Sequence, residues 1–170
     1  MMALEGHTWT TDTETHSIRI QHLTDDERSA FIEHVTGAKI DPFLTPPEEE
    51  TRYVSFLIKV ENRAEVVATF NPQDCWLVTS RNQVLYPLVL DDLGASYRAM
   101  GSDLPEAYNV VRPAIVENRT MLLQGESIAG LLVYNMIKPK TKNFQIDVTL
   151  NWGDGNTIKT FAPYRRPKKK

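Results

Sequence analysis

The chain has 170 residues, of which 41% are hydrophobic, a length typical of one domain with a sizeable core. Cys75 is its only cysteine, which excludes an internal disulfide and a cluster of thiolate metal ligands. Residues 1–162 carry 14 basic and 22 acidic residues, a net charge of −8, and such an acidic body argues against a nucleic-acid-binding surface. The basic tail, residues 163–170, is interpreted as a solvated terminus, with contact to anionic lipid or nucleic acid as the alternative.

The N-terminal part contains one well-marked helix. Residues 1–16 are polar and rich in threonine and are expected to be a flexible leader, and residues 17–23 are predicted to form a strand. Thr24 and Glu27 have the spacing of a capping box and predict a short helix over residues 24–36. The residues at helical spacing on its expected apolar face are Ala30, Phe31, His34 and Val35.

A proline-rich segment, residues 41–47, separates this helix from the strands, because prolines remove backbone donors. The next predicted strand, residues 53–60, alternates with period two and places Phe56 and Ile58 on one face. Three short strands are predicted to follow, separated by turns, at residues 66–70, 75–79 and 84–90. Short strands at this spacing favour a sandwich over alternating strand–helix units.

Residues 91–117 lack strand signals and are predicted to form a partly helical insertion, with a helical turn over 104–111. Tyrosine, arginine and methionine are enriched at protein interfaces, and the insertion supplies a set of candidate binding residues. These are Tyr97, Arg98, Met100, Tyr108 and Arg112. The alternative is that the tyrosines cap the open end of the sandwich.

The strongest strand signal lies near the C-terminus, after predicted strands at 120–123 and 128–134. Apolar and polar residues alternate over residues 144–152, and Asp154-Gly155 then predicts a hairpin to residues 157–161. The expected polar face is interpreted as ordinary solvated surface. It comprises Gln145, Asp147, Thr149 and Asn151.

Several turns and strands together carry a resemblance to a known family. The chain has Val60-Glu61-Asn62 at a strand end, an Asn71-Pro72 corner, and Gly125-Glu126-Ser127 before the strand at 128–134. In this order it resembles the immunoglobulin-like β-sandwich domains of bacterial envelope lipoproteins, including telokin-like domains of unknown function. The resemblance covers residues 52–152. It implies a mainly β, antiparallel sandwich with its core in residues 52–161, within one domain over 17–162.

No catalytic constellation is found. The four histidines all lie before residue 35 and lack the spacing of metal ligands, and Cys75 is expected to be a core residue. We therefore expect no catalytic residue, no metal and no cofactor. Asp91-Asp92 and the glutamates at 48–50 are interpreted as solvated acids, the alternative being the paired carboxylates of a hydrolase.

The resemblance and the missing catalytic set predict a non-catalytic interaction or structural domain of an envelope lipoprotein or periplasmic accessory protein. Its partner is expected to be a protein, not nucleic acid, with contact to a membrane only through a lipid anchor. The expected location is the cell envelope or periplasm for a chain trimmed at its N-terminus, and the cytoplasm otherwise. A cytosolic regulatory or small-ligand-binding sandwich is the second alternative, and a hydrolase the third.

Overall fold

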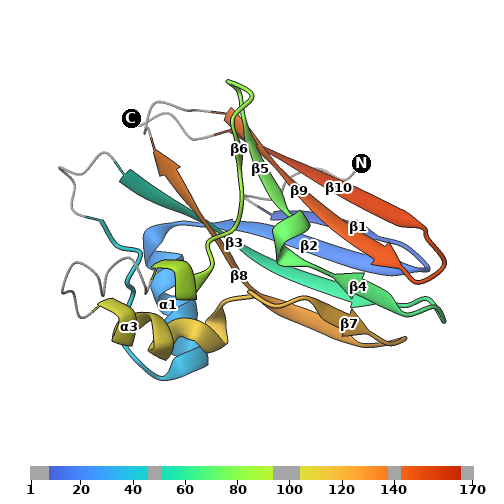
Figure 1. Ribbon diagram of the computed structural model, residues 1–170, viewed down its shortest axis with the longest axis horizontal. Helices are drawn as coiled ribbons and strands as arrows, with labels where there is room; N and C mark the ends of the chain where they lie inside the picture. Colours follow the sequence, from blue (N-terminus) through green and yellow to red (C-terminus); the bar gives the residue numbers. More distant parts are fainter. Residues whose placement is uncertain (1–7, 46–50, 94–103, 138–142, 166–170) are drawn as a thin grey trace.

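A computed structural model describes residues 8–45, 51–93, 104–137 and 143–165, and these form two antiparallel sheets packed face to face (Figure 1). The first sheet contains, in spatial order, β1 (Thr8–Asp12), β2 (His16–Leu23), β3 (Thr51–Asn62) and β8 (Ser127–Ile137). The second sheet contains β6 (Val84–Leu85), β5 (Trp76–Thr79), β9 (Asn143–Trp152), β4 (Ala68–Phe70) and β7 (Thr120–Leu122), with β10 (Thr157–Arg165) paired to β9. The predicted mainly β sandwich with few helices is confirmed.

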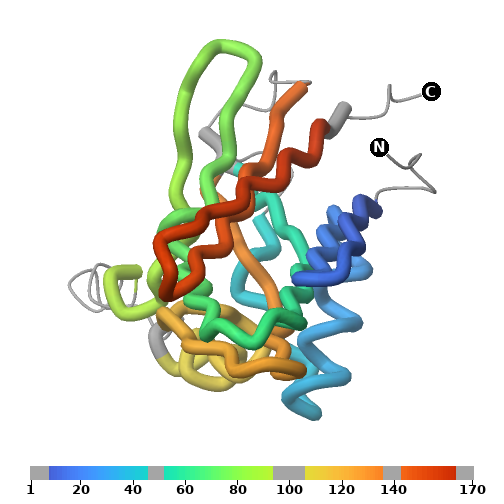
Figure 2. The backbone as a smooth tube through the Cα atoms, turned by 90° about the vertical axis from the view of Figure 1, so that its right-hand side faces the viewer, coloured from blue at the N-terminus to red at the C-terminus, as the bar shows by residue number. Residues whose placement is uncertain are grey.

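Strand β9 organises the six-stranded sheet. Strand β10 pairs with β9 from Asn143 to Asn151 along one edge, so β5 and β4 share the other edge, one after the other. A short 3₁₀ helix, Pro72–Asp74, separates β5 from β4, because Pro72 has no N–H to give to a ladder. The β5–β6 hairpin projects from one end of this sheet (Figure 2).

The main core lies between the sheets. The alternation of β3 buries Phe56, Ile58 and Val60 against β9 and its neighbours. Tyr134 of β8 reaches across the core, and its hydroxyl donates to the carbonyl oxygen of Cys75 at 2.8 Å. Cys75 itself is fully buried, which confirms its prediction as a core residue.

A second apolar cluster covers one end of the outer face of the four-stranded sheet. There α1 (Asp25–Thr36), α3 (Leu104–Val111) and the 3₁₀ helix Arg112–Ala114 lie against β8 (Figure 1). Leu131 and Val133 face this cluster, while Leu132 and Tyr134 face the main core. Strand β8 is therefore apolar on both faces, as its continuous apolar sequence indicates. No helix among the described segments is long and apolar enough to cross a membrane.

The buried face of α1 differs from the prediction. The capping box of Thr24 and Glu27 is present, and Gly37 ends the helix in the left-handed conformation. The residues that α1 buries are Arg28 and Ile32, whereas Ala30, His34 and Val35 are exposed. Charge pairing explains why Arg28 is buried.

Arg28 is fully buried, because its guanidinium meets two carboxylates and a hydroxyl. It donates to Asp41 at 2.9 Å, to Asp25 at 2.8 Å and to Ser55 of β3 at 3.3 Å. A buried charge of this kind is tolerated only when it is paired and hydrogen-bonded.

Two further expectations need correction. The leader expected over 1–16 contains β1, in which Trp9 pairs with Ile20 and packs against the main core; threonine-rich segments favour strands. The strand expected over 84–90 ends at Leu85, and residues 90–93 are helical, because Pro87 interrupts the ladder. The basic tail also begins later than expected, since β10 extends to Arg165.

Candidate binding surface

Of the five binding residues predicted in the insertion, the structure describes Tyr108 and Arg112. Tyr108 is only 1% exposed and packs on Phe43, with ring centroids 5.9 Å apart. Arg112 forms ion pairs with Asp91 at 2.6 Å and Glu117 at 2.5 Å. Tyr97, Arg98 and Met100 lie outside the described residues. Tyr108 is buried in the second apolar cluster, and a binding role of the insertion stays a prediction, as does the capping alternative.

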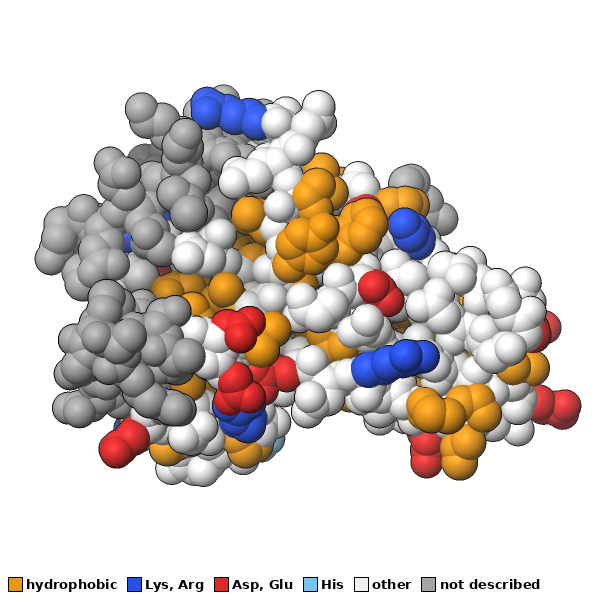
Figure 3. Space-filling model, in the orientation of Figure 1, with side chains coloured by type: hydrophobic (Ala, Val, Ile, Leu, Met, Phe, Trp, Pro, Cys, Tyr) orange, Lys and Arg blue, Asp and Glu red, His pale blue; other side chains and the backbone are white. Residues whose placement is uncertain are grey.

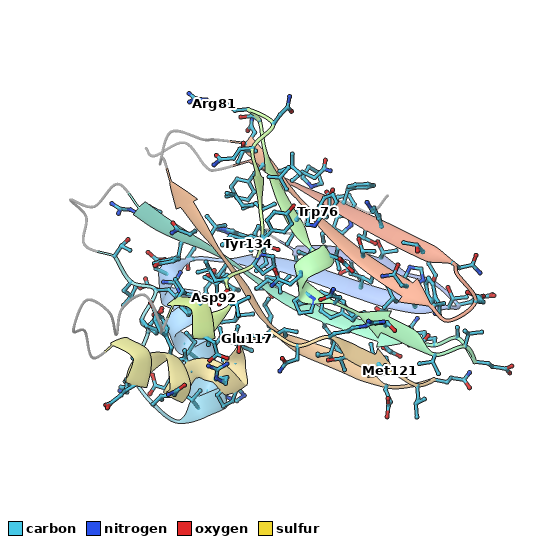
Figure 4. All side chains as sticks on the ribbon, in the orientation of Figure 1. Trp76, Arg81, Asp92, Glu117, Met121 and Tyr134 are labelled. Carbon is cyan, nitrogen blue, oxygen red and sulfur yellow. The ribbon has the colours of Figure 1, made fainter. Side chains whose placement is uncertain are left out.

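The Arg112 pairs have a structural consequence. Glu117 accepts the backbone N–H of Leu90 at 2.6 Å as well as the guanidinium of Arg112. Because Leu90 is buried in the second cluster, these contacts tie the segment before the insertion to the C-terminal part of the insertion. Glu117 and Asp92 lie at the end of the molecule that carries the helices α1 and α3 (Figure 4).

A group of exposed and half-buried apolar side chains lies on the outer face of the six-stranded sheet. We call it the aromatic patch, and it comprises Trp76, Val78, Val84, Tyr86 and Phe161. Tyr86 is 55%, Phe161 46% and Val84 42% exposed. Figure 3 shows hydrophobic atoms gathered on this face, in the region where Figure 4 labels Trp76.

Strand alternation explains why these side chains point outward. In β5, Leu77 and Thr79 are buried in the sandwich, so Trp76 and Val78 lie on the opposite face. In β10, Thr160 and Ala162 are buried and Phe161 is exposed. The same sheet is therefore apolar on its inner face and, locally, on its outer face.

Asp147 lies within the aromatic patch. The register places it directly between Trp76 of β5 and Phe161 of β10. Its residue is only 9% exposed, and the side-chain amide of Gln145 donates to its Oδ1 at 2.7 Å. Burial raises the pKa of Asp147, while Gln145 and the positive charge of Lys159 oppose this effect.

This burial corrects the interpretation of the polar face of β9. Asp147 and Thr149 are buried and Gln145 and Asn151 are half-buried, so the face is not ordinary solvated surface. Side chains of the flanking strands cover it, because β5 and β10 both lie beside β9 and carry large residues there.

Lys159 adds a cation to the patch. Its Nζ lies 5.0 Å from the centroid of the Trp76 ring, so its side chain crosses β9 from β10 to β5. The indole N–H of Trp76 donates to the carbonyl oxygen of Gln73 at 3.2 Å, and Tyr86 packs edge-on at 6.2 Å between ring centroids. These contacts hold the indole in place, with its face toward a positive charge.

A polar depression of about 340 Å³ lies on the same face, beside the 3₁₀ helix that precedes β5. Its lining is rich in hydrogen-bonding groups. The lining side chains include Thr69, Asn71, Asp74, Arg119 and Asn151. Together, the patch and the depression present aromatic rings, amides and both signs of charge on one sheet face.

Cys75 and His16, the two groups best suited to nucleophile or proton-transfer chemistry, are both buried. Burial raises the pKa of the Cys75 thiol to about 12, which makes the thiolate scarce at neutral pH. Burial also lowers the pKa of His16, whose Nδ1 lies 3.0 Å from the hydroxyls of Thr13 and Thr15. The described residues contain no group of three or more histidine, cysteine, aspartate or glutamate side chains placed to hold a metal ion.

The aromatic patch is the surface that sequence reasoning missed. A signal was present, because Trp76 and Phe161 alternate out of phase with the core residues of their own strands. An aromatic residue on the nominally polar face of a strand indicates an unusual outer face.

A scan against protein-family models found no match, and no curated protein matches the sequence. Several solved structures are similar to this chain at low sequence identity. A putative ApaA protein from Bordetella pertussis has 8% identity and a TM-score of 0.42, over 93% of this chain and 100% of that one. A FixG-related protein from Vibrio parahaemolyticus has 10% identity and a TM-score of 0.45, over 92% and 100%. A functionally unknown protein from Listeria monocytogenes EGD-e has 11% identity and a TM-score of 0.46, over 94% and 82%.

At these identities and TM-scores, the similarity identifies neither a family nor a function.

Proposed function

We propose that the protein is a non-catalytic interaction domain that binds a protein partner across the outer face of its six-stranded sheet. The observation that carries this proposal is the aromatic patch, in which Tyr86 is 55% and Phe161 46% exposed beside Trp76. Contiguous exposed apolar surface marks interaction sites, and tryptophan and tyrosine contribute strongly to binding at interfaces.

We further propose that the domain acts in the bacterial cell envelope, as part of a lipoprotein or a periplasmic accessory protein. The resemblance carried by the Glu61-Asn62 and Gly125-Glu126-Ser127 turns supports this setting. The burial of the single cysteine is compatible with an oxidising compartment. A small-ligand-binding sandwich is the alternative, favoured by the polar depression of about 340 Å³, whose volume falls within the range of ligand pockets.

Photocrosslinking tests the protein-binding surface. A photoreactive phenylalanine analogue replaces Tyr86 or, separately, Phe161 in the full chain, expressed in the native bacterium. The matched control places the same group at Arg19, which is exposed on the outer face of the four-stranded sheet. We expect a light-dependent adduct of one defined mass from both patch positions and none from Arg19.

The same adduct from all three positions, or no adduct from either patch position, would contradict the proposed function. Circular dichroism of each variant establishes that the sandwich is folded. Fractionation of the cells checks the location, since a protein recovered with the cytosol would contradict the envelope setting.

A further inference from the structure

We propose that the aromatic patch recognises a positively charged side chain of the protein partner, an arginine or a lysine, that pairs with Asp147 and packs on Trp76 and Phe161. This inference rests on the proposed function, because it names the chemistry by which that surface would select its partner.

The first argument concerns the carboxylate. Asp147 is 9% exposed and lies between two aromatic residues in the strand register. Gln145 donates to one carboxylate oxygen, and no described basic group forms an ion pair with Asp147 or hydrogen-bonds its other oxygen. Largely buried aspartates are almost always paired with a cation. The patch therefore holds a largely buried carboxylate that Gln145 hydrogen-bonds and that forms no ion pair with a described residue.

The second argument concerns the aromatic rings. The Nζ of Lys159 lies 5.0 Å from the centroid of the Trp76 ring, which shows that this ring face accepts a cation. Lys159 is opposite Thr149, two residues along β9 from Asp147. Its ammonium group forms no ion pair with a described carboxylate, so it occupies the ring face and acts on Asp147 only from a distance, by opposing the rise of its pKa. A cation from a partner would compete with Lys159 for this position.

Other partner chemistries fit the patch less well. An apolar segment would remove the remaining water from Asp147 without supplying a counter-charge, and such desolvation is costly. An anionic group would be repelled by the carboxylate at the centre of the patch. A planar guanidinium suits both the carboxylate and the rings of the patch, because it forms bidentate hydrogen bonds with carboxylates and stacks on aromatic rings.

The test is a titration of the isotope-labelled full chain, followed by NMR, with a blocked Gly-Arg-Gly peptide as the probe. The neutral control is the same peptide with citrulline in place of arginine, which keeps the shape and removes the charge. We expect the arginine peptide to shift the indole N–H signal of Trp76 and the amide signals of residues 145–149. The citrulline peptide should bind about tenfold more weakly or not at all, since the charge-assisted hydrogen bonds are lost.

Two variants separate the roles of the charges. Asp147→Asn should weaken binding of the arginine peptide about tenfold, whereas Asp26→Asn, which removes an exposed charge from α1, should leave it unchanged. Lys159→Ala should strengthen binding roughly twofold to fivefold, because it removes the competing cation from Trp76.

Equal binding of the two peptides, no shift with the arginine peptide, or an unchanged affinity of Asp147→Asn would each overturn the inference. Weaker binding by Lys159→Ala would also overturn it, since Lys159 would then be part of the site. Maltotriose serves as a glycan probe, and shifts of the same signals by maltotriose but not by the arginine peptide would overturn the inference in favour of a sugar site.

The crosslinking experiment separates this inference from the proposed function. If the adduct at Tyr86 is lost in Trp76→Ala but persists in Asp147→Asn, the surface binds its partner without charge recognition, and only the inference fails. If the wild-type surface forms no adduct, the proposed function fails.

Discussion

Asn62, at the end of β3, offers a sharp test of how the turns hold the two sheets together. It is fully buried, and its side chain makes four hydrogen bonds. The amide nitrogen donates to the carbonyl oxygens of Val66 and Leu122, each at 2.9 Å. The amide oxygen accepts the backbone N–H of Ala64 at 3.1 Å and the indole N–H of Trp152 at 3.2 Å.

Replacing Asn62 by alanine removes these four bonds and leaves their partners unsatisfied. A net contribution of about 1 kcal/mol for each bond gives an expected loss of roughly 4 kcal/mol in the free energy of unfolding. Asn62→Asp should destabilise at least as much near neutral pH, because a buried carboxylate would face the two carbonyl oxygens. The control is Asn151→Ala, which removes one exposed contact with Thr157 and should cost less than about 1 kcal/mol.

Urea unfolding of the variants, followed by tryptophan fluorescence and circular dichroism, measures these losses by linear extrapolation. A loss below about 1 kcal/mol for Asn62→Ala would refute the reasoning, as would an Asn62→Asp variant that is clearly more stable than the alanine variant. A changed denaturant dependence would indicate that the unfolded or native state had changed in compactness.

Three further predictions concern the interior. Cys75, whose pKa is raised to about 12, should resist alkylation at about pH 8 until urea unfolds the chain; labelling of the folded protein at the rate of a free thiol would contradict its burial. Gly130→Ala should cost roughly 1–3 kcal/mol, because the new Cβ would lie 2.6 Å from Val116 Cγ2 and 3.1 Å from the Ala114 carbonyl oxygen; urea midpoints equal to wild type would show that Val116 yields freely. Burial, with repulsion from Arg63, lowers the pKa of His16, so the unfolded state binds a proton first and stability falls as pH drops below about 6.5. His16→Gln should therefore lose less stability than wild type between about pH 7.5 and pH 5, and an identical loss would assign the acid sensitivity to other groups.

The sequence predicts best where one local rule acts alone. The capping box at Thr24 and the alternation of β3 were predicted correctly, because each depends on neighbouring residues. The burial of Arg28 could not be predicted, because it requires Asp41 and Ser55 to meet in space. Tertiary pairing reverses the ordinary preference of an arginine for water.

The burial of an acid in the candidate surface also depends on tertiary pairing that the sequence does not show. The alternation of β9 predicted a strand, but whether Asp147 meets water depends on which strands pair beside it. The register brings Trp76 and Phe161 next to Asp147, and these residues are separated by long stretches of sequence. Their strands signalled aromatic residues on an outer face, but no local pattern indicates which acid they enclose.

The contacts of Arg28 also determine how the molecule comes apart. Its guanidinium joins α1, the segment at Asp41 and strand β3, so α1 cannot move away from the sheet without leaving paired charges unsatisfied. The helix and the sandwich should thus form one cooperative unit of unfolding. For the same reason, Arg28 and Asp41 are a pair that can be replaced together by apolar residues more easily than either can be replaced alone.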